Sequence, residues 1–266
     1  MKLSFITTFY NSSDYISECL NSVQEISSQY NIEHILVNDG STDKSLEIVS
    51  NPKLKNIMIL GKDHIGRGPA LNLGFENATG DYICILDSDD IINPKWIDLF
   101  FKNYMEYDHI SVFFGQIASN LEIFKFYEPP SQIYESVLNP IKLLFYNPIC
   151  HSGTILRRCS VAKINGYSTS IKSQFDWDLW LRLSFINENF ISIDYLAAFK
   201  RLHLNQSFES RNHFFYTIRG AVLQLKATMN SKPIYFLPVM IFAIIRIIWS
   251  FFPRKLRTSR LLDMLR

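Results

Sequence analysis

The sequence predicts an α/β protein with a Rossmann-like, mostly parallel β-sheet that is flanked by helices. Three observations predict this class. Strand-like and helix-like segments alternate through the first hundred residues, which is the pattern of βαβ units. The strand-like segments are short and apolar, as buried strands are. Polar clusters follow three of these segments directly, at the carboxyl ends of the strands, where the ligands of such sheets bind.

The composition is that of a globular chain with enough apolar residues for a sizeable core. The chain has 266 residues, of which 47% are hydrophobic and 20% charged, so it holds one or two domains and is not intrinsically disordered. A net charge of +2 is too small to indicate nucleic-acid binding. The four cysteines form no CxxC pair and are predicted to be reduced. A strand-like run follows Met1-Lys2 in place of a signal peptide, so we expect a cytoplasmic protein.

Predicted strands and helices alternate in the first half of the chain. The predicted strands are Leu3–Thr8, His34–Val37, Asn56–Leu60 and Asp81–Leu86. The predicted helices are Ser12–Ile26, a segment from the turn at Asp43 to about Ser50, Pro69–Ala78, and one that begins at Asn93-Pro94. Apolar residues at helical spacing support the first helix, and a capping Asn followed by Pro is a common helix start.

The second half of the chain is less regular. Two strand-like segments, Ile110–Gly115 and Leu121–Tyr127, are close enough in sequence to pair as a hairpin. The other predicted elements are a strand at Ile149–Leu156, a helix at Phe175–Phe185, a strand at Phe190–Leu196 and a long helix at Glu209–Met229.

The C-terminal segment changes character. The apolar run Ile234–Phe252 matches the ~20 residues of a membrane-spanning helix, and only Pro238, Arg246 and Ser250 interrupt it. An Arg near the middle disfavours a simple span. The basic residues that follow, Arg254, Lys255, Arg257 and Arg260, suit anionic lipid headgroups on a cytoplasmic face. Three interpretations stay open: a shallowly inserted or re-entrant helix, a true span, and a core-packed or dimerising helix.

The segment Asp87-Ser88-Asp89-Asp90 ends an apolar strand with a cluster of carboxylates. Such a cluster is costly unless a positive charge neutralises it. Asp87 and Asp89 can share a divalent cation through hard oxygen ligands, with phosphate oxygens and water in the remaining positions. The alternative is a group of solvated acids next to the helix that starts at Asn93.

A second polar cluster, Asn38–Asp43, follows the strand His34–Val37. Asp39 at a strand end can accept the imide N–H of uracil, and Tyr10 at the end of the neighbouring strand can stack on that ring. The alternative is an Asx turn that caps the next helix. The sequence contains neither GxGxxG nor GxxxxGK[ST], which removes support for dinucleotide binding and for P-loop chemistry.

The ordered motifs of the first hundred residues resemble those of glycosyltransferase family 2. They are Thr8-Phe9-Tyr10-Asn11, Asn38-Asp39-Gly40-Ser41-Thr42-Asp43, Ala70-Leu71-Asn72-Leu73-Gly74, Ala78-Thr79-Gly80-Asp81-Tyr82-Ile83 and Leu86-Asp87-Ser88-Asp89-Asp90. The match is close over residues 1–100 and looser up to about residue 207. The resemblance implies a GT-A fold and transfer of a sugar from a nucleotide-sugar donor with inversion at the anomeric carbon.

The resemblance also implies which residues bind the donor. Thr8, Tyr10 and Asp39 match the nucleobase pocket. Asp87, Ser88 and Asp89 match the DxD motif, which holds the ribose and the metal-bridged diphosphate. The cofactor implied is a divalent metal, Mn²⁺ or Mg²⁺, with Asp87 and Asp89 as ligands.

Later segments resemble the acceptor side and the closing element of the family. Asp176, within Phe175–Arg182, takes the place of the catalytic base. Trp177 and Trp180 beside it either pack in the core or form a platform for the acceptor sugar. Lys200-Arg201-Leu202-His203 resembles the late Arg-x-His element that closes over the diphosphate, and His203 is either a metal or diphosphate ligand or a structural residue.

The sequence departs from the family pattern at three positions. Asn38 replaces the usual first Asp of the base-binding loop, which bears on nucleotide preference. Leu71 stands where many members carry Arg, and Arg67 is a candidate source of that charge in donor binding. Phe175 replaces the Glu of the usual Glu-Asp pair, which bears on acceptor contacts.

We expect residues 1–207 to form the transferase domain, with a nucleotide-sugar half at 1–100 and an acceptor half at 101–207. Residues 208–266 are expected to form a helical extension that attaches to the cytoplasmic face of the membrane. The expected substrates are a UDP-sugar and a saccharide or lipid-linked saccharide, in bacterial-type surface polysaccharide or lipopolysaccharide synthesis.

The sequence supports two other functions less well. A nucleotidyltransferase would need a basic, Gly-rich loop for a triphosphate near the N-terminus, and residues 8–14 contain none. A catalytically silent, membrane-bound GT-A protein is the other alternative. The presence of Asp87, Asp89 and Asp176 opposes it. The oligomeric state is left open.

Overall fold

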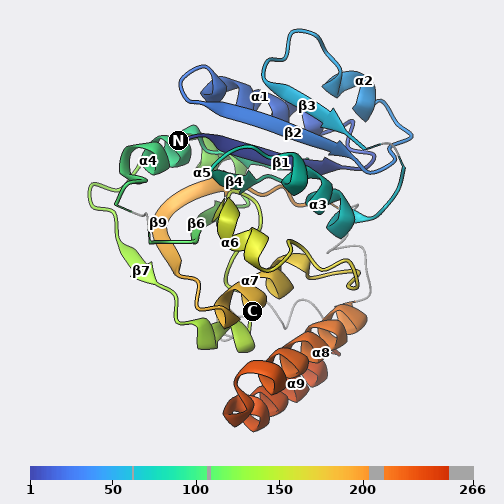
Figure 1. The fold of residues 1–266 in the computed structure, drawn as a ribbon, viewed down its shortest axis with the longest axis vertical. Helices are drawn as coiled ribbons and strands as arrows, with labels where there is room; N and C mark the ends of the chain where they lie inside the picture. The colour runs from blue at the N-terminus through green and yellow to red at the C-terminus, as the bar shows by residue number, and fades with distance from the viewer. Residues whose placement is uncertain (62, 107–108, 204–212, 252–266) are drawn as a thin grey trace.

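The computed structural model describes residues 1–61, 63–106, 109–203 and 213–251. A nine-stranded β-sheet forms its centre, with strand order β3-β2-β1-β4-β8-β6-β9-β5, and β7 pairs with β9 (Figure 1). The strands are β1 Leu3–Phe9, β2 Ile32–Asn38, β3 Ile57–Leu60, β4 Tyr82–Ile85, β5 Ile91–Ile92, β6 Val112–Ala118, β7 Glu135–Val137, β8 Ile155–Arg157 and β9 Phe190–Phe199.

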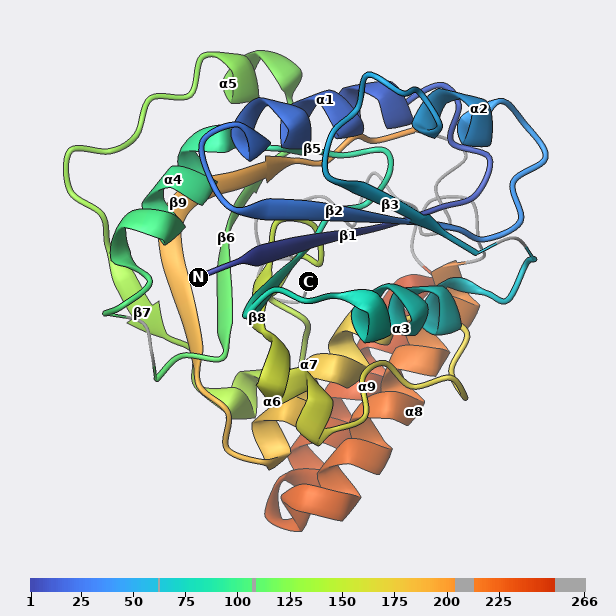
Figure 2. The ribbon, with the colours of Figure 1, turned by 45° about the horizontal axis from the view of Figure 1, so that its top comes forward.

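Helices cover both faces of the sheet. Figure 2 shows α1, α2, α4 and α5 on one face and α3, α6 and α7 on the other, with α8 and α9 as a hairpin beside α7. The helices are α1 Ile16–Ser27, α2 Ser45–Val49, α3 Arg67–Asn77, α4 Pro94–Asn103, α5 Leu121–Lys125, α6 Arg158–Lys163, α7 Phe175–Phe185, α8 His213–Ser231 and α9 Phe236–Ser250, with 3₁₀ turns η1 Pro140–Leu144 and η2 Pro233–Tyr235.

The first half folds as the alternation of the sequence predicts. β1 pairs in parallel with β2 and β4, and β2 pairs in parallel with β3. Successive residues of β1 point to opposite faces of the sheet. Phe5 therefore packs in the core under α1 and α4, whereas Ile6 packs in the core under α3 and α7. Burial on both faces explains why β1, β2 and β4 are so apolar.

Two predicted strands of the second half are wrong. Leu121–Tyr127 is not a strand: helix α5 begins there, because Asn120 Oδ1 accepts hydrogen bonds from the backbone N–H groups of Glu122 (2.8 Å) and Ile123 (3.2 Å). The predicted hairpin is absent, and β6 pairs instead with β8 and β9. Of Ile149–Leu156 only the end is strand, since Gly153 at φ +80° turns the chain before β8.

The second half also makes the sheet mixed. β8 runs antiparallel to β4 and β6, and β5 and β7 run antiparallel to β9. The short elements β5, β7 and α6 had no sequence prediction. Helix α7 has the bounds that the sequence predicts, and β9 extends three residues past its predicted end to Phe199.

The C-terminal helices pack against α7 and η1. Helix α8 begins at His213, and the earlier part of its prediction, 209–212, lies outside the described residues, as do the predicted domain boundary at 207 and the basic residues after 251. Among the described residues one helical stretch, Pro233–Ser250, is long and apolar enough to cross a membrane, with a mean hydropathy of 1.9. Only 11% of this stretch is buried.

Candidate active site

The three predicted polar clusters meet at one edge of the sheet. The N–H of Asp39 donates to Phe9 O (2.9 Å), which joins the ends of β2 and β1. The N–H of Leu86 donates to Ile6 O (3.1 Å), which joins β4 to β1. The hydroxyl of Ser88 lies 2.8 Å from that of Ser12. Residues separated by up to 76 positions in the sequence therefore form one surface at the carboxyl ends of the strands.

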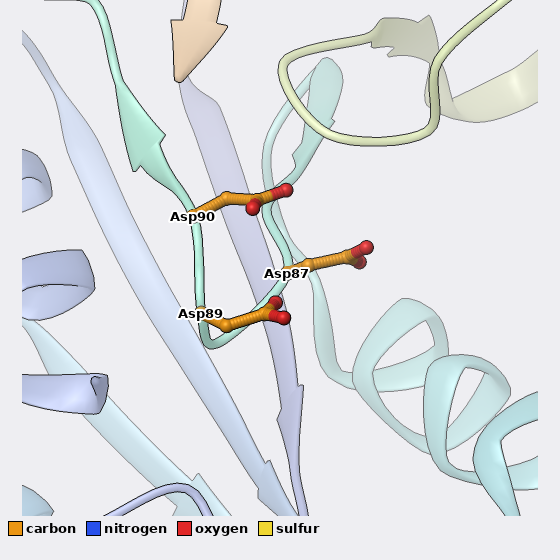
Figure 3. A group of neighbouring side chains, drawn as sticks. All are labelled: Asp87, Asp89 and Asp90. Carbon is orange, nitrogen blue, oxygen red and sulfur yellow. The ribbon is translucent and has the colours of Figure 1, made fainter. Parts of the chain in front are cut away.

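Three carboxylates gather in the turn after β4. Figure 3 shows Asp87, Asp89 and Asp90 with their side chains on the same side of this turn, and one oxygen of each lies within 4.8 Å of the others. Asp90 is only 1% exposed. Its burial and the charges of Asp87 and Asp89 raise the pKa of Asp90 well above the usual range. A cation in this position would relieve the repulsion between the three groups.

The acidic cluster fits a divalent metal. All of its donor atoms are carboxylate oxygens, which Mg²⁺ and Mn²⁺ prefer. Asp90 Oδ2 is buried without a hydrogen-bond partner, so it remains available to a metal. Two of the predicted ligands, Asp87 and Asp89, belong to the cluster. The third predicted ligand, His203, contacts the cluster through Asp89, with its Nε2 2.9 Å from Asp89 Oδ2. Asp90 was not predicted as a ligand.

The segment after β9 lies against this cluster. The backbone N–H of Arg201 donates to Asp90 Oδ1 (3.0 Å), and Arg201 Nε donates to the carbonyl of Asp89 (3.2 Å). Burial alone would lower the pKa of Lys200, but Cys150 and the charges of Asp87, Asp90 and Asp176 raise it. The Lys200 ammonium therefore adds a positive charge beside the carboxylates.

Arg67 at the start of α3 forms an ion pair with Asp87. Burial alone would raise the pKa of Asp87, but Arg67 and His151 hold that pKa well below its usual range. His151 Nδ1 lies 3.4 Å from Arg67 Nη2, and His151 Nε2 lies 2.8 Å from the Tyr167 hydroxyl. His151 and Tyr167 were not predicted as site residues, because each is isolated in the sequence from any motif.

The loop after β2 brings together the residues of the predicted nucleobase pocket. Asp39 Oδ1 accepts hydrogen bonds from the backbone of Ile65 (2.7 Å) and Gly66 (2.9 Å), so this carboxylate also holds the chain that leads into α3. His64, which was not predicted as a site residue, lies with its Nδ1 3.3 Å from Asp39 Oδ2. The ring of Tyr10, 51% exposed, lies 4.8 Å from the His64 ring.

Two further polar residues lie at these strand ends, Asn38 at the end of β2 and Thr8 near the end of β1. Asn38 is buried, and its Oδ1 accepts the N–H of Ser41 (2.9 Å), which an aspartate at this position would also do. Thr8 is half-buried on β1, opposite Val37 of β2.

Asp176 occupies the first turn of α7. Asp176 Oδ2 accepts a hydrogen bond from Asn147 Nδ2 (2.7 Å). The charges of Asp87, Asp176 and Asp89 raise the pKa of Arg67. The start of α3 also touches α7, because a Cβ at Gly68 would lie 3.3 Å from the ring of Phe175. Arg67 therefore lies in the field of both the acidic cluster and Asp176.

The two tryptophans of α7 are core residues, so the prediction of a platform for the acceptor sugar is wrong for them. Trp177 is 3% exposed and Trp180 is 0% exposed. The Nε1 of Trp177 donates to the carbonyl of Leu143 (2.8 Å), which fixes the ring inside the protein. Neither ring is accessible to a sugar, because both pack in the core and the Arg246 guanidinium lies over the Trp177 ring.

The arrangement combines an acidic cluster that could hold a metal, the positive charges of Arg67 and Lys200, and the carboxylate of Asp176. Arg67, Lys200 and a metal at the cluster would stabilise a developing diphosphate charge. Asp176 is a further carboxylate outside that cluster. Such a division of roles suits group transfer from a diphosphate leaving group to a hydroxyl.

Sequence comparisons agree with these motifs. The family model described as "Glycosyl transferase family 2" matches residues 4–164. An uncharacterized glycosyltransferase of Haemophilus influenzae is 31% identical over 229 residues, which are 79% of this chain and 68% of that protein. The glycosyltransferase GlyA of Streptococcus pneumoniae is 36% identical over 109 residues, but they make up only 15% of its length.

Solved structures share the fold. S. aureus TarS (residues 1–349), in complex with UDP-GlcNAc, superposes with a TM-score of 0.68 at 18% identity, over 100% of this chain and 78% of that chain. The mannosyltransferase PcManGT of Pyrobaculum calidifontis, in complex with GDP-Man and Mn²⁺, superposes with a TM-score of 0.62 at 16% identity, over 99% of this chain and 84% of that chain. At this level of identity the likeness concerns the fold.

Proposed function

This chain belongs to glycosyl transferase family 2, and we propose that it moves a sugar from a UDP-sugar to a hydroxyl of a saccharide or lipid-linked saccharide, with inversion at the anomeric carbon. The observation that carries this proposal is the acidic cluster of Asp87, Asp89 and Asp90, with Arg67 paired to Asp87 and His203 in contact with Asp89, at the carboxyl ends of the strands. Family membership disfavours the nucleotidyltransferase alternative. A catalytically silent GT-A protein is disfavoured by the acidic cluster and by the separate carboxylate of Asp176.

The donor side is proposed to bind a nucleotide. TarS binds UDP-GlcNAc and PcManGT binds GDP-Man, and both share this fold. Tyr10 offers an exposed ring for stacking, and Asp39 offers its second carboxylate oxygen to a base N–H. Thr8 and Ser88 are proposed to line this pocket, because they lie at the same strand ends. We favour UDP because the imide of uracil presents a single N–H donor to such a carboxylate.

The chemistry is proposed to be a direct displacement. Asp176 takes the proton of the acceptor hydroxyl. At the same time the hydroxyl oxygen attacks the anomeric carbon, and the bond from this carbon to the diphosphate breaks. Asp87, Asp89 and Asp90 would hold a divalent metal, which neutralises the leaving diphosphate when it is bound. Arg67 and Lys200 add positive charge on the same side. His203 is proposed to orient Asp89 and to lie next to the diphosphate.

A membrane surface is proposed as the place of the acceptor. Helix α9 carries a stripe of exposed apolar side chains: Leu237, Ile241, Ile244, Ile245, Ile248 and Phe251. The sequence after this helix continues with Arg254, Lys255, Arg257 and Arg260, which suit anionic headgroups. We therefore propose a shallow, interfacial attachment at the cytoplasmic face of the membrane, and a role in surface polysaccharide or lipopolysaccharide synthesis.

A true span is disfavoured by the packing of the opposite face of α9. Val239 and Ala243 are buried against the protein, and the Arg246 guanidinium lies 5.6 Å from the centroid of the Trp177 ring. Spanning would pull these three residues away from the domain, which would leave Trp177 exposed and place a charged group in the hydrocarbon. An interfacial helix keeps both faces satisfied.

The proposed function predicts that Asp176→Asn separates donor binding from turnover. UDP-sugars are incubated with the full chain and Mn²⁺, and release of UDP is followed with and without saccharide acceptors. The variant should bind UDP as tightly as the wild type but turn over about 10²–10⁴-fold more slowly, because a general base contributes that factor. Release of UDP at the wild-type rate by Asp176→Asn would show that the base lies elsewhere. Absence of UDP release from every donor by the wild-type protein would contradict the transferase proposal.

A further inference from the structure

We infer that the α8–α9 hairpin positions the proposed catalytic base, and that Gly220 and Arg246 are positioning residues for Asp176. The inference rests on the proposed function of Asp176 and goes beyond it, because it assigns a role in the chemical step to helices whose other face is proposed to meet the membrane. It draws on contacts made by the hairpin with the two segments that hold Asp176.

The first of these segments is the start of α7. Gln174, immediately before α7, is buried and has a left-handed backbone conformation (φ 60°, ψ 36°), which is unfavourable for a residue other than Gly. Surrounding contacts must therefore hold it. Gln174 Nε2 donates to the carbonyl of Tyr216 on α8 (3.0 Å). Helix α8 thus fixes the residue that starts the helix of Asp176.

Gly220 lets α8 come close to this turn. A Cβ at Gly220 would lie 3.0 Å from Gln174 Nε2 and 3.3 Å from Trp177 Cζ3. Contacts this short are tighter than ordinary van der Waals contacts. A larger residue at 220 would therefore push against Gln174 and Trp177, which lie on either side of Asp176 in the sequence. From α9, Arg246 covers the ring of Trp177, with its guanidinium carbon 5.6 Å from the centroid.

The second segment is the loop that follows η1. Its Asn147 donates the hydrogen bond to Asp176 Oδ2, at 2.7 Å. The hairpin holds this loop as well: Gln224 Nε2 on α8 donates to the carbonyl of Phe145, and Phe242 on α9 packs edge-on against the Phe145 ring, with centroids 5.6 Å apart. The hairpin of α8 and α9 therefore contacts both the start of α7, which carries Asp176, and the loop of Asn147, which binds its side chain.

The donor side is held by different elements. Asp87 and Asp89 follow β4, Tyr10 follows β1, and Arg67 begins α3. Loss of the hairpin contacts should therefore shift Asp176 while the donor pocket stays in place. A displacement of about 1 Å in a reacting group costs up to about 100-fold in rate. The expected signature is a lower kcat with an unchanged affinity for UDP.

The test uses the full chain with the UDP-sugar that the wild-type protein turns over. Arg246→Ala and Gly220→Ala should each lower kcat for UDP release by at least about tenfold, with the Kd for UDP in Mn²⁺ unchanged. Arg246→Lys should recover part of the loss, because an ammonium also binds an aromatic face. The matched controls are Val222→Ala and Met229→Ala, which change exposed side chains of α8 outside the stripe of α9, and both should keep the wild-type kcat.

The outcomes separate the inference from the proposed function. Wild-type kcat in both Arg246→Ala and Gly220→Ala would overturn the inference and leave the proposed function intact. A parallel loss of kcat and of UDP affinity would also overturn it, because it would indicate a general structural defect. If the wild-type protein itself releases no UDP from any donor, the proposed function fails, and the inference fails with it.

Discussion

At the scale of single residues, two neighbouring aspartates of the acidic cluster behave in opposite ways. Burial would raise the pKa of both, but Arg67 and His151 lower the pKa of Asp87 and keep it ionised. For Asp90, burial together with the charges of Asp87 and Asp89 outweighs the hydrogen bond from the Arg201 N–H and raises the pKa. The difference explains how one turn can hold three carboxylates, and why a cation would still be needed to ionise all of them.

Asp89→Asn should weaken the Mn²⁺-dependent binding of UDP by at least about tenfold, because one anionic ligand of the proposed metal is lost. Calorimetric titration of UDP with and without Mn²⁺ measures this effect. Asp14→Asn, an exposed aspartate outside the cluster, is the matched control and should bind UDP like the wild type. Equal UDP affinity in Asp89→Asn and wild type would remove Asp89 from the metal site.

Glu33 on β2 predicts a pH dependence of stability. Burial opposes its ionisation, but hydrogen bonds from Lys2 (2.7 Å), Ser4 (2.6 Å) and Thr79 (2.7 Å) lower the pKa of Glu33 to about 2. Because this value lies below that of an unfolded glutamate, its contribution is fully present above about pH 4.5 and is lost as the pH falls through about 2.

Glu33→Gln should therefore lower the free energy of unfolding by about 1.5–3 kcal/mol at neutral pH and by much less near pH 2. Denaturant unfolding at several pH values measures both differences. Glu25→Gln changes an exposed glutamate and should leave stability within about 0.5 kcal/mol of the wild type. A loss that is the same at all pH values would contradict the role of the Glu33 charge.

At the scale of elements, helix α3 packs unusually close to the sheet. A Cβ at Gly74 would lie 2.6 Å from Ile6 Cγ2 on β1 and 3.2 Å from Val37 Cγ2 on β2. Gly74→Ala should therefore destabilise the protein by about 1–3 kcal/mol, although Ala is the better helix former by about 1 kcal/mol. Thermal or denaturant unfolding tests this. Glu76→Ala, on the exposed face of the same helix, should have almost no effect, and a stabilised Gly74→Ala variant would contradict the close packing.

The elements also show where sequence reasoning works. Alternating apolar strands and helices in the first half are local patterns, and the structure confirms them. Leu121–Tyr127 shows the limit: its apolar residues resemble a strand, but the cap at Asn120 starts a short helix that packs on β9. Such a short apolar segment is ambiguous, because the packing partner decides its conformation.

At the scale of the whole molecule, the C-terminal hairpin has two different faces. One face of α9 contributes Val239, Ala243 and Arg246 to contacts with the rest of the protein. The opposite face presents only apolar side chains, such as Ile241 and Ile248, to the outside. Exposed apolar surface of this kind marks an interaction surface. Attachment through it would leave the contact between α9 and Trp177 in place.

Combined replacement of Ile241, Ile245 and Ile248 by Ser should reduce binding to vesicles of phosphatidylcholine and phosphatidylglycerol by about 100-fold. Each half-exposed isoleucine is worth about 1 kcal/mol on transfer to lipid, and three of them about 3 kcal/mol. Flotation with vesicles measures the bound fraction. Ile123→Ser with Phe126→Ser removes exposed apolar side chains near α5 and should bind vesicles like the wild type. A full-length protein that ignores these vesicles would contradict membrane attachment.

The sequence by itself determined the fold of the first half of this protein. Strand periodicity, turn residues and the order of the motifs are local properties, and parallel strands necessarily bring their carboxyl ends to one edge. Position alone therefore placed Tyr10, Asp39 and Asp87 at one edge of the sheet. The order of the motifs indicated the family.

Only the tertiary structure decided what surrounds Asp176 and which face of the last helix is buried. The partners Asn147 and Arg67 are far from Asp176 in the sequence, and no local pattern connects them. Trp177 follows Asp176 directly, yet it is buried because α7 packs between η1 and the C-terminal hairpin. An apolar helix has the same sequence whether it spans, lies on a membrane or packs in a core. The sequence does not give the burial of one face of α9, because burial depends on contacts between segments that the chain brings together only on folding.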